Sequence, residues 1–115
     1  MKSTERGAEG ERQACDVLRD AGYLIVTRNW RTRFGEIDVI ARDGDTLVFV
    51  EVKVRSREDY GGPEAALARW KQKRIVAAAK QFIADTETEM PARFDLVAIG
   101  PGGVRIIKDA FREDS

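Results

Sequence analysis

The stretch that most constrains the fold of this chain is VFVEVKV, residues 48–54. Its β-branched and aromatic side chains are typical of a strand that is covered on both faces. Such a strand lies inside a sheet with other layers packed on it, which predicts an α/β layer fold. Glu51 and Lys53 interrupt the run and, being two residues apart, share one face of the strand. Because buried charge is costly unless it is paired or binds a metal, these two residues mark a candidate site.

Local signals predict further elements around this strand. Helices are expected at 4–21, between a candidate N-cap at Thr4 and a candidate stop at Gly22, and at 63–85, where apolar residues recur at helical spacing. Strands are expected at 23–30, 35–41, 46–54, 93–99 and 104–111. The chain of 115 residues shows no repeat or linker. We therefore expect one domain, residues 1–115, with a mixed sheet and helices packed on its faces.

The complete absence of histidine limits the chemistry that this chain can perform. It excludes, within one chain, Ser-His-Asp and Cys-His sites and any imidazole ligand for a metal. The single Cys15 cannot build a thiolate zinc site. Catalysis would therefore depend on carboxylates, Lys, Arg, hydroxyls and a hard cation such as Mg²⁺.

The sequence also indicates where the protein works. A lone cysteine excludes an internal disulfide, which fits a reducing compartment. The opening residues MKSTERGAEGER are too polar for the core of a signal peptide, and no apolar run is long enough to span a membrane. We expect a cytoplasmic protein without a membrane partner.

The hairpin of the second and third strands brings acidic residues together. A two-residue Gly44-Asp45 turn pairs residues whose numbers sum to 89, so that Ile37 faces Val52, Val39 faces Val50 and Ala41 faces Val48 on an apolar face. On the other face, Ile40 opposes Phe49, Asp38 opposes Glu51 and Glu36 opposes Lys53. A turn at Asp43-Gly44 would move Asp38 diagonal to Glu51 but leave both on one face.

Two carboxylates in this position repel each other. At about 4 Å and an effective dielectric constant near 20, the repulsion is on the order of 4 kcal/mol. A proton on one carboxyl group, the ammonium of Lys53, or a divalent cation between the two acids would relieve it. Because Lys53 already opposes Glu36, we expect a cation. A simple solvated Glu-x-Lys pair is the alternative interpretation.

Basic residues gather in three places along a chain whose charges balance, with 20 of each sign. Among them Arg31, Arg33, Arg55 and Lys71 are candidate contacts to the phosphates of a nucleic acid, and solubility is the alternative explanation of their charge. Trp30 and Trp70 are candidates for stacking on bases, with core packing the more ordinary role.

The acidic pattern resembles that of the PD-(D/E)xK nuclease superfamily: an acid on one strand and an acid-x-Lys on the next, here Asp38 followed by Glu51-Val52-Lys53. The whole chain more closely resembles the YraN family of bacterial endonuclease-like proteins, through GERQA (10–14), AGYLIVTRNWRTRFGEIDVIA (21–41), FVEVKVR (49–55) and KQKRI (71–75). The proline that precedes the first acid in the superfamily is Ile37 here.

This resemblance implies a restriction-endonuclease-like αβββαβ core and metal-dependent hydrolysis of DNA, with branched or single-stranded structures in repair or recombination as candidate substrates. Asp38 and Glu51 would bind Mg²⁺ or Mn²⁺ with the Val52 carbonyl, and Lys53 would orient or deprotonate the attacking water. Glu11 matches a helical glutamate that some members add to the metal site. Glu36 would be an auxiliary residue.

Superfamily members that cut DNA junctions often act as dimers, so a homodimer is one expected assembly. A catalytically inactive module that binds nucleic acid or protein on the same fold is the alternative.

Overall fold

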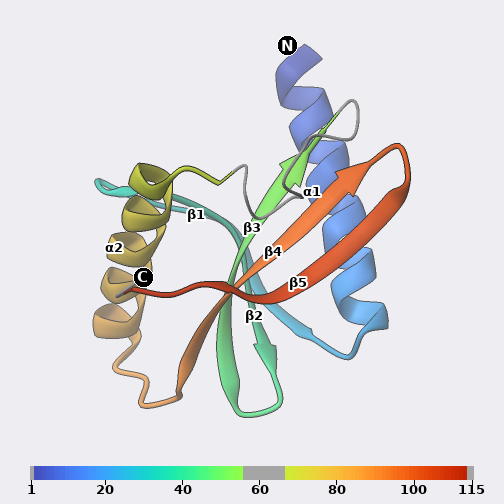
Figure 1. Cartoon of the computed structure of the whole chain (residues 1–115). Helices are drawn as coiled ribbons and strands as arrows, with labels where there is room; N and C mark the ends of the chain where they lie inside the picture. The colour runs from blue at the N-terminus through green and yellow to red at the C-terminus, as the bar shows by residue number, and fades with distance from the viewer. Residues whose placement is uncertain (1, 56–66, 114–115) are drawn as a thin grey trace.

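The fold is a five-stranded sheet with one helix on each face (Figure 1). The computed structural model describes residues 2–55 and 67–113, with side chains from residue 7 onward. The elements in chain order are α1 (Lys2–Asp20), β1 (Leu24–Thr32), β2 (Gly35–Asp43), β3 (Thr46–Val54), α2 (Arg69–Thr86), β4 (Ala92–Gly100) and β5 (Gly103–Phe111). This is the predicted α/β order, and it is consistent with an αβββαβ core. Among the described residues, no helix is long and apolar enough to cross a membrane.

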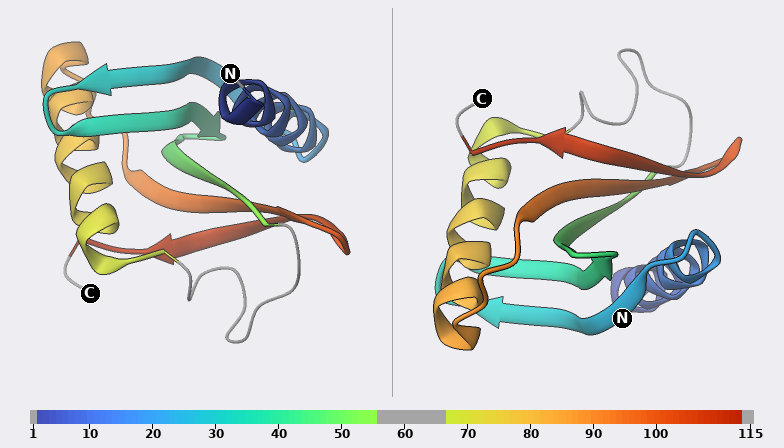
Figure 2. Two further views of the ribbon diagram at one scale, coloured as in Figure 1. Left: turned by 90° about the horizontal axis from the view of Figure 1, so that it is seen from above. Right: turned by 90° about the horizontal axis from the view of Figure 1, so that it is seen from below.

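The strands follow the order β1-β2-β3-β4-β5 across the sheet. The β3–β4 pair is parallel, and the other neighbours are antiparallel. The parallel pair is joined through α2, as a crossover connection requires. The two views of Figure 2 show α2 and α1 at opposite sides of the strands.

Separate hydrophobic clusters lie on the two faces of the sheet. On one face, the buried α1 residues Ala14, Cys15 and Leu18 pack on valines of β2, β3 and β4. On the other, Ile75, Val76, Ala78 and Ala79 of α2 pack on Ile37, Ile40, Leu47 and Phe49. Val48, Phe49 and Val50 are fully buried in these two layers. The prediction of a strand covered on both faces is therefore confirmed.

The ends of the helices differ in part from the sequence prediction. Gly22 stops α1 as expected: the N–H of Gly22 donates to Arg19 O and that of Tyr23 to Leu18 O, a Schellman motif made possible by the positive φ of Gly22. The helix already includes Thr4, so Thr4 is not its N-cap. The second helix begins at Arg69, later than the expected residue 63. Residues 63–66 of that prediction lie outside the described part of the chain.

The predicted register of the β2–β3 hairpin is confirmed from its turn to the middle of the strands. Asp43 pairs with Thr46, and the ladder continues through Ala41–Val48 to Val39–Val50. Gly44 has φ 63°, which the first position of a type II′ turn requires.

Side-chain alternation along β2 fails at Asp38. The sequence places Ile37 on the face of Val39, but Ile37 packs with Ile40 in the α2-side core, while Val39 lies in the α1-side core. The neighbouring strand β1 is distorted at the same level, because Asn29, opposite Asp38, has the left-handed φ of 54°. The hairpin of β1 and β2 therefore departs from a regular ladder on both strands at the level of Asp38.

Candidate metal and phosphate site

The candidate site is a cavity of about 350 Å³ between the sheet and the first turns of α2. Its described lining comprises Gly35, Glu36 and Asp38 of β2, Glu51 and Val52 of β3, and Trp70, Lys71, Arg74 and Ile75 of α2. Two strands and one helix, distant in the sequence, thus bring three acids and two cations to one place.

Asp38 occupies the position where the β2–β3 ladder is interrupted. The backbone N–H of Val52 donates to Asp38 Oδ2 at 2.8 Å, so the side chain takes the place of a strand partner. This bond fixes the carboxyl group between the strands, next to Glu51. The prediction that Asp38 and Glu51 converge is therefore consistent with the structure, although the local geometry departs from a regular ladder.

The carboxyl group of Asp38 holds its proton far more tightly than an exposed aspartate, because its pKa is raised. Burial raises the pKa of Asp38 to about 8, and repulsion by the Glu51 carboxylate, a hydrogen bond between the two side chains and repulsion by Glu11 act in the same direction. The hydrogen bond from Val52 opposes this rise and is outweighed. Near neutral pH, with no added cation, Asp38 therefore keeps its proton and donates it to Glu51.

The cation that pairs with Glu51 is Lys71, on α2. The Lys71 Nζ lies 2.8 Å from Glu51 Oε2, and the Glu51 side chain is only 5% exposed. Burial disfavours the charge of Lys71, but the hydrogen bond and attraction of Glu51, with a smaller attraction from Asp38, raise its pKa overall. Sequence reasoning considered Lys53 for this neutralising role and assigned Lys71 only a phosphate contact.

Lys53 lies on β3, as Glu51 does, but it is not among the described residues that line the cavity. It is half-buried and follows Glu51 by two residues, which places it on the same face of β3. Glu36, expected opposite Lys53, accepts a hydrogen bond from Arg31 Nε at 3.0 Å. Arg31 therefore stands at the rim of the cavity, with most of its side chain in solvent.

Glu11 lies on α1, which covers the opposite face of the sheet, and it is not among the described residues that line the cavity. It is half-buried on α1 and acts electrostatically on Asp38. The preceding Gly10 is buried, and a Cβ atom there would lie 2.8 Å from Val54 Cγ2. The lack of a side chain at Gly10 therefore lets α1 approach the end of β3. At this distance the charge of Glu11 contributes to the raised pKa of Asp38.

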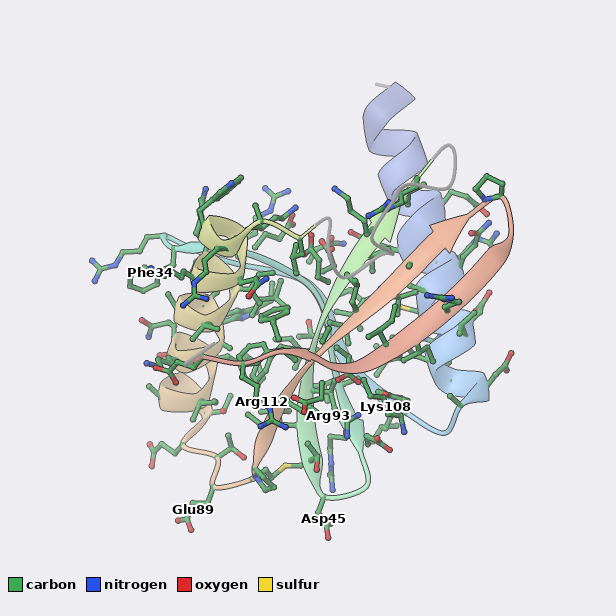
Figure 3. All side chains as sticks on the ribbon, viewed as in Figure 1. Phe34, Asp45, Glu89, Arg93, Lys108 and Arg112 are labelled. Atoms are coloured by element: carbon green, nitrogen blue, oxygen red, sulfur yellow. The ribbon has the colours of Figure 1, made fainter. Side chains whose placement is uncertain are left out.

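The remaining predicted phosphate contacts, Arg33 and Arg55, are not among the described residues that line the cavity. Arg33 is exposed beside the ring of Phe34, at 5.0 Å from its centroid. Figure 3 shows Phe34 at the β1–β2 turn, beside α2. Arg55 follows β3 and donates its backbone N–H to Ile99 O at 2.8 Å. Sequence reasoning missed Arg74, whose Nε donates to Phe34 O at 2.8 Å and ties α2 to this turn.

The sequence contains a signal that Lys71 faces the sheet. Ile75, Ala78, Ala79 and Phe82 form the face of α2 that packs on the sheet. Lys71 precedes Ile75 by four residues and so extends the same face by one turn. A lysine on the sheet-facing side of a helix requires an acidic partner on that sheet, and Glu51 is that partner.

The donors at this site suit a hard cation that keeps part of its hydration. Within the described ranges, no three Asp, Glu, His or Cys side chains are grouped closely enough to hold a metal ion by themselves. The site offers the carboxyl groups of Asp38 and Glu51, and Val52 lies in the lining beside them. Mg²⁺ is commonly bound by one or two carboxylates together with waters and substrate phosphates, so this set fits it.

A second group of buried charges lies elsewhere and has a structural role. The fully buried Asp95 of β4 accepts hydrogen bonds from Tyr23 Oη at 2.7 Å, from Arg93 and from the backbone N–H of Asp109. Arg93 also bonds to Asp43, and Figure 3 shows it beside Lys108. Because each charge has partners, this network holds β4 to its neighbours without an added ion.

Comparison with known proteins places the chain among relatives of unassigned activity. Residues 10–99 match the sequence model of "Uncharacterised protein family UPF0102", and this range includes all the site residues named above. The UPF0102 protein of Thermodesulfovibrio yellowstonii is 41% identical over 96% of this chain and 99% of its own length. Those of Syntrophus aciditrophicus and Persephonella marina are 49% and 39% identical, over 91% and 99% of this chain and 87% and 99% of their own lengths.

Proposed function

This chain belongs to the UPF0102 family, and we propose that it is a metal-dependent endonuclease that hydrolyses phosphodiester bonds of DNA. The observation that carries the proposal is the contact between Asp38 and Glu51 inside one cavity, where burial and the Glu51 carboxylate raise the pKa of Asp38 to about 8. The end of the β2–β3 ladder also supports the proposal, because the Val52 N–H donates to the Asp38 side chain and not to a backbone carbonyl of β2.

In this proposal the chain supplies ligands, charge and orientation. Asp38 and Glu51, with the Val52 carbonyl, would hold Mg²⁺ or Mn²⁺, and Glu11 would add a direct or water-bridged contact. The bound ion would neutralise charge on the phosphate and lower the pKa of a coordinated water. Lys53 would orient or deprotonate that water and stabilise developing charge, and the auxiliary Glu36 would keep Arg31 at the rim.

Lys71 has two roles in this scheme. Its Nζ atom lies 2.8 Å from Glu51 Oε2, so the ammonium group competes with an incoming cation for that oxygen. Once displaced, it lies within the same cavity and is available to contact the substrate phosphate. Arg31 and Arg33 are exposed at the rim, where they would contact flanking phosphates, and Arg55 is assigned the same role.

A non-catalytic module that binds DNA is the second candidate, and the Lys71–Glu51 ion pair favours it. This pair, with the proton on Asp38, resolves the charges of the site without a metal. Such a module would bind DNA equally well with and without divalent cations, and Asp38→Asn would leave its binding intact.

A cleavage panel separates these candidates. Linear, single-stranded, flapped and four-way DNA would be incubated with Mg²⁺ or Mn²⁺ and the wild type, Asp38→Asn, Glu51→Gln or the control Asp45→Asn, an exposed turn residue. We expect cleavage by the wild type and by Asp45→Asn, a loss of at least about a hundredfold in the two site variants, and no cleavage in EDTA. Equal cleavage by all four proteins would assign the activity to a contaminant and refute the proposal.

A further inference from the structure

The two tryptophans of this chain have opposite environments. Trp30 packs edge-on against Phe82, with ring centroids 5.1 Å apart, as part of the α2-side core. Trp70, the second residue of α2, is 61% exposed. A single exposed aromatic residue is ordinary on a protein surface. Trp70 differs because it lines the cavity that contains Asp38 and Glu51.

The surroundings of Trp70 have the charge that a nucleic-acid backbone requires. The helix carries Arg69, Lys71, Lys73, Arg74 and Lys80 before its first acid, Asp85. Arg74 is one turn after Trp70, on the same side of the helix, and also lines the cavity. Its bond to Phe34 O fixes it next to the β1–β2 turn. An exposed indole ring is thus flanked by cations at the mouth of an acidic centre.

We propose that Trp70 stacks on an unpaired base of the DNA strand whose phosphate lies at Asp38 and Glu51, so that the site selects single-stranded or unpaired segments over blunt duplex. The inference rests on the proposed function and assigns its substrate class. Unpaired bases expose their rings to an aromatic side chain, whereas bases in a duplex are already stacked on each other. The cations of α2 would track the phosphates of the same strand, which is how proteins commonly hold single-stranded DNA.

Tryptophan fluorescence tests this binding directly. The protein would be titrated with a short oligo(dT) and with a blunt hairpin of equal phosphate number, in EDTA and again in Ca²⁺, a hard cation that takes oxygen ligands. We expect oligo(dT) to quench the wild-type emission. Trp70→Phe, which leaves only the core residue Trp30, should lose the quenching while still binding oligo(dT).

Affinities of Trp70→Ala provide the second readout. Stacking on one base predicts about tenfold weaker oligo(dT) binding and a change within about twofold for the hairpin. Leu24→Ala is the matched control, because Leu24 is 62% exposed on β1 and is not among the described residues that line the cavity. It should bind both ligands as the wild type does.

Two outcomes would overturn the inference. One is equal weakening, or none, for oligo(dT) and the hairpin in Trp70→Ala; the other is quenching that persists in Trp70→Phe. Neither outcome contradicts the proposed endonuclease activity. A wild type that binds neither DNA in either condition would instead contradict the proposed function, so the two failures are distinguishable.

Discussion

Replacing Asp38 by asparagine should make the metal-free protein more stable at alkaline pH. The pKa of Asp38 in the folded chain, about 8, lies above the ordinary value of 3.8 because burial and Glu51 disfavour its charge. Between these two values the folded chain holds a proton that the unfolded chain has released. The free energy of unfolding of the wild type therefore falls as pH rises through this window.

The size of the effect follows from the width of the window. Each pKa unit corresponds to about 1.36 kcal/mol, so about four units give an upper limit near 6 kcal/mol. This is comparable with the roughly 5–15 kcal/mol that stabilises a small domain. The asparagine side chain of Asp38→Asn would not titrate, and its amide oxygen can still accept the hydrogen bond from the Val52 N–H, so the substitution removes the loss without removing the contact.

Urea unfolding in EDTA, repeated from about pH 4 to pH 9, measures this difference. We expect the stability of the wild type to decline by several kcal/mol relative to Asp38→Asn across the window, with most of the loss complete near pH 8. Asp45→Asn, at the exposed tip of the β2–β3 turn, controls for the general effect of an acid-to-amide change. Parallel declines in the wild type and Asp38→Asn would refute the account of a buried, shared proton.

Two further predictions concern the elements that surround the acids. Lys71→Met should lower the melting temperature of the metal-free protein, because it leaves the buried Glu51 without its cation, and should enlarge the stabilisation by Mn²⁺ in thermal melts; an unchanged Mn²⁺ effect would contradict competition for Glu51. Gly10→Ala should destabilise the chain by about 1 kcal/mol, because overpacking against Val54 Cγ2 at 2.8 Å outweighs the gain in helix propensity. Gly7→Ala, with nothing within 4 Å of its Cβ, should stabilise the chain instead, and shifts of equal sign would show that α1 does not approach β3 closely at Gly10.

The architecture could be predicted from the sequence because the signals for helix ends, turns and strands each lie within a few residues. The Schellman stop at Gly22, the turn at Gly44 and the alternation in β3 each depend on a few neighbouring residues. The hairpin register then followed from placing valines on one face. The register holds from the turn to the Val39–Val50 pair and so brings Asp38 close to Glu51, although the two acids do not form the predicted ladder pair.

The details of the site depended on contacts between distant segments. The break in alternation at Asp38 accompanies a left-handed residue on another strand, Asn29, whose side chain gives little sequence signal. The partner of Glu51 comes from α2, and only the docking of that helix decides whether Lys71 or Lys53 lies closer. Core packing is the more ordinary role for Trp70, but this residue lies about 100° around the helix from Lys71, is exposed and lines the cavity.

Titration calorimetry with Mn²⁺ tests the central claim most directly, namely that Asp38 and Glu51 form a site for a divalent cation. The wild type should bind Mn²⁺ and release protons near neutral pH, since the ion displaces the proton of Asp38. Asp38→Asn and Glu51→Gln should lose this binding, while Asp45→Asn retains it. Absence of Mn²⁺ binding by the wild type, or equal binding by all four proteins, would contradict the claim.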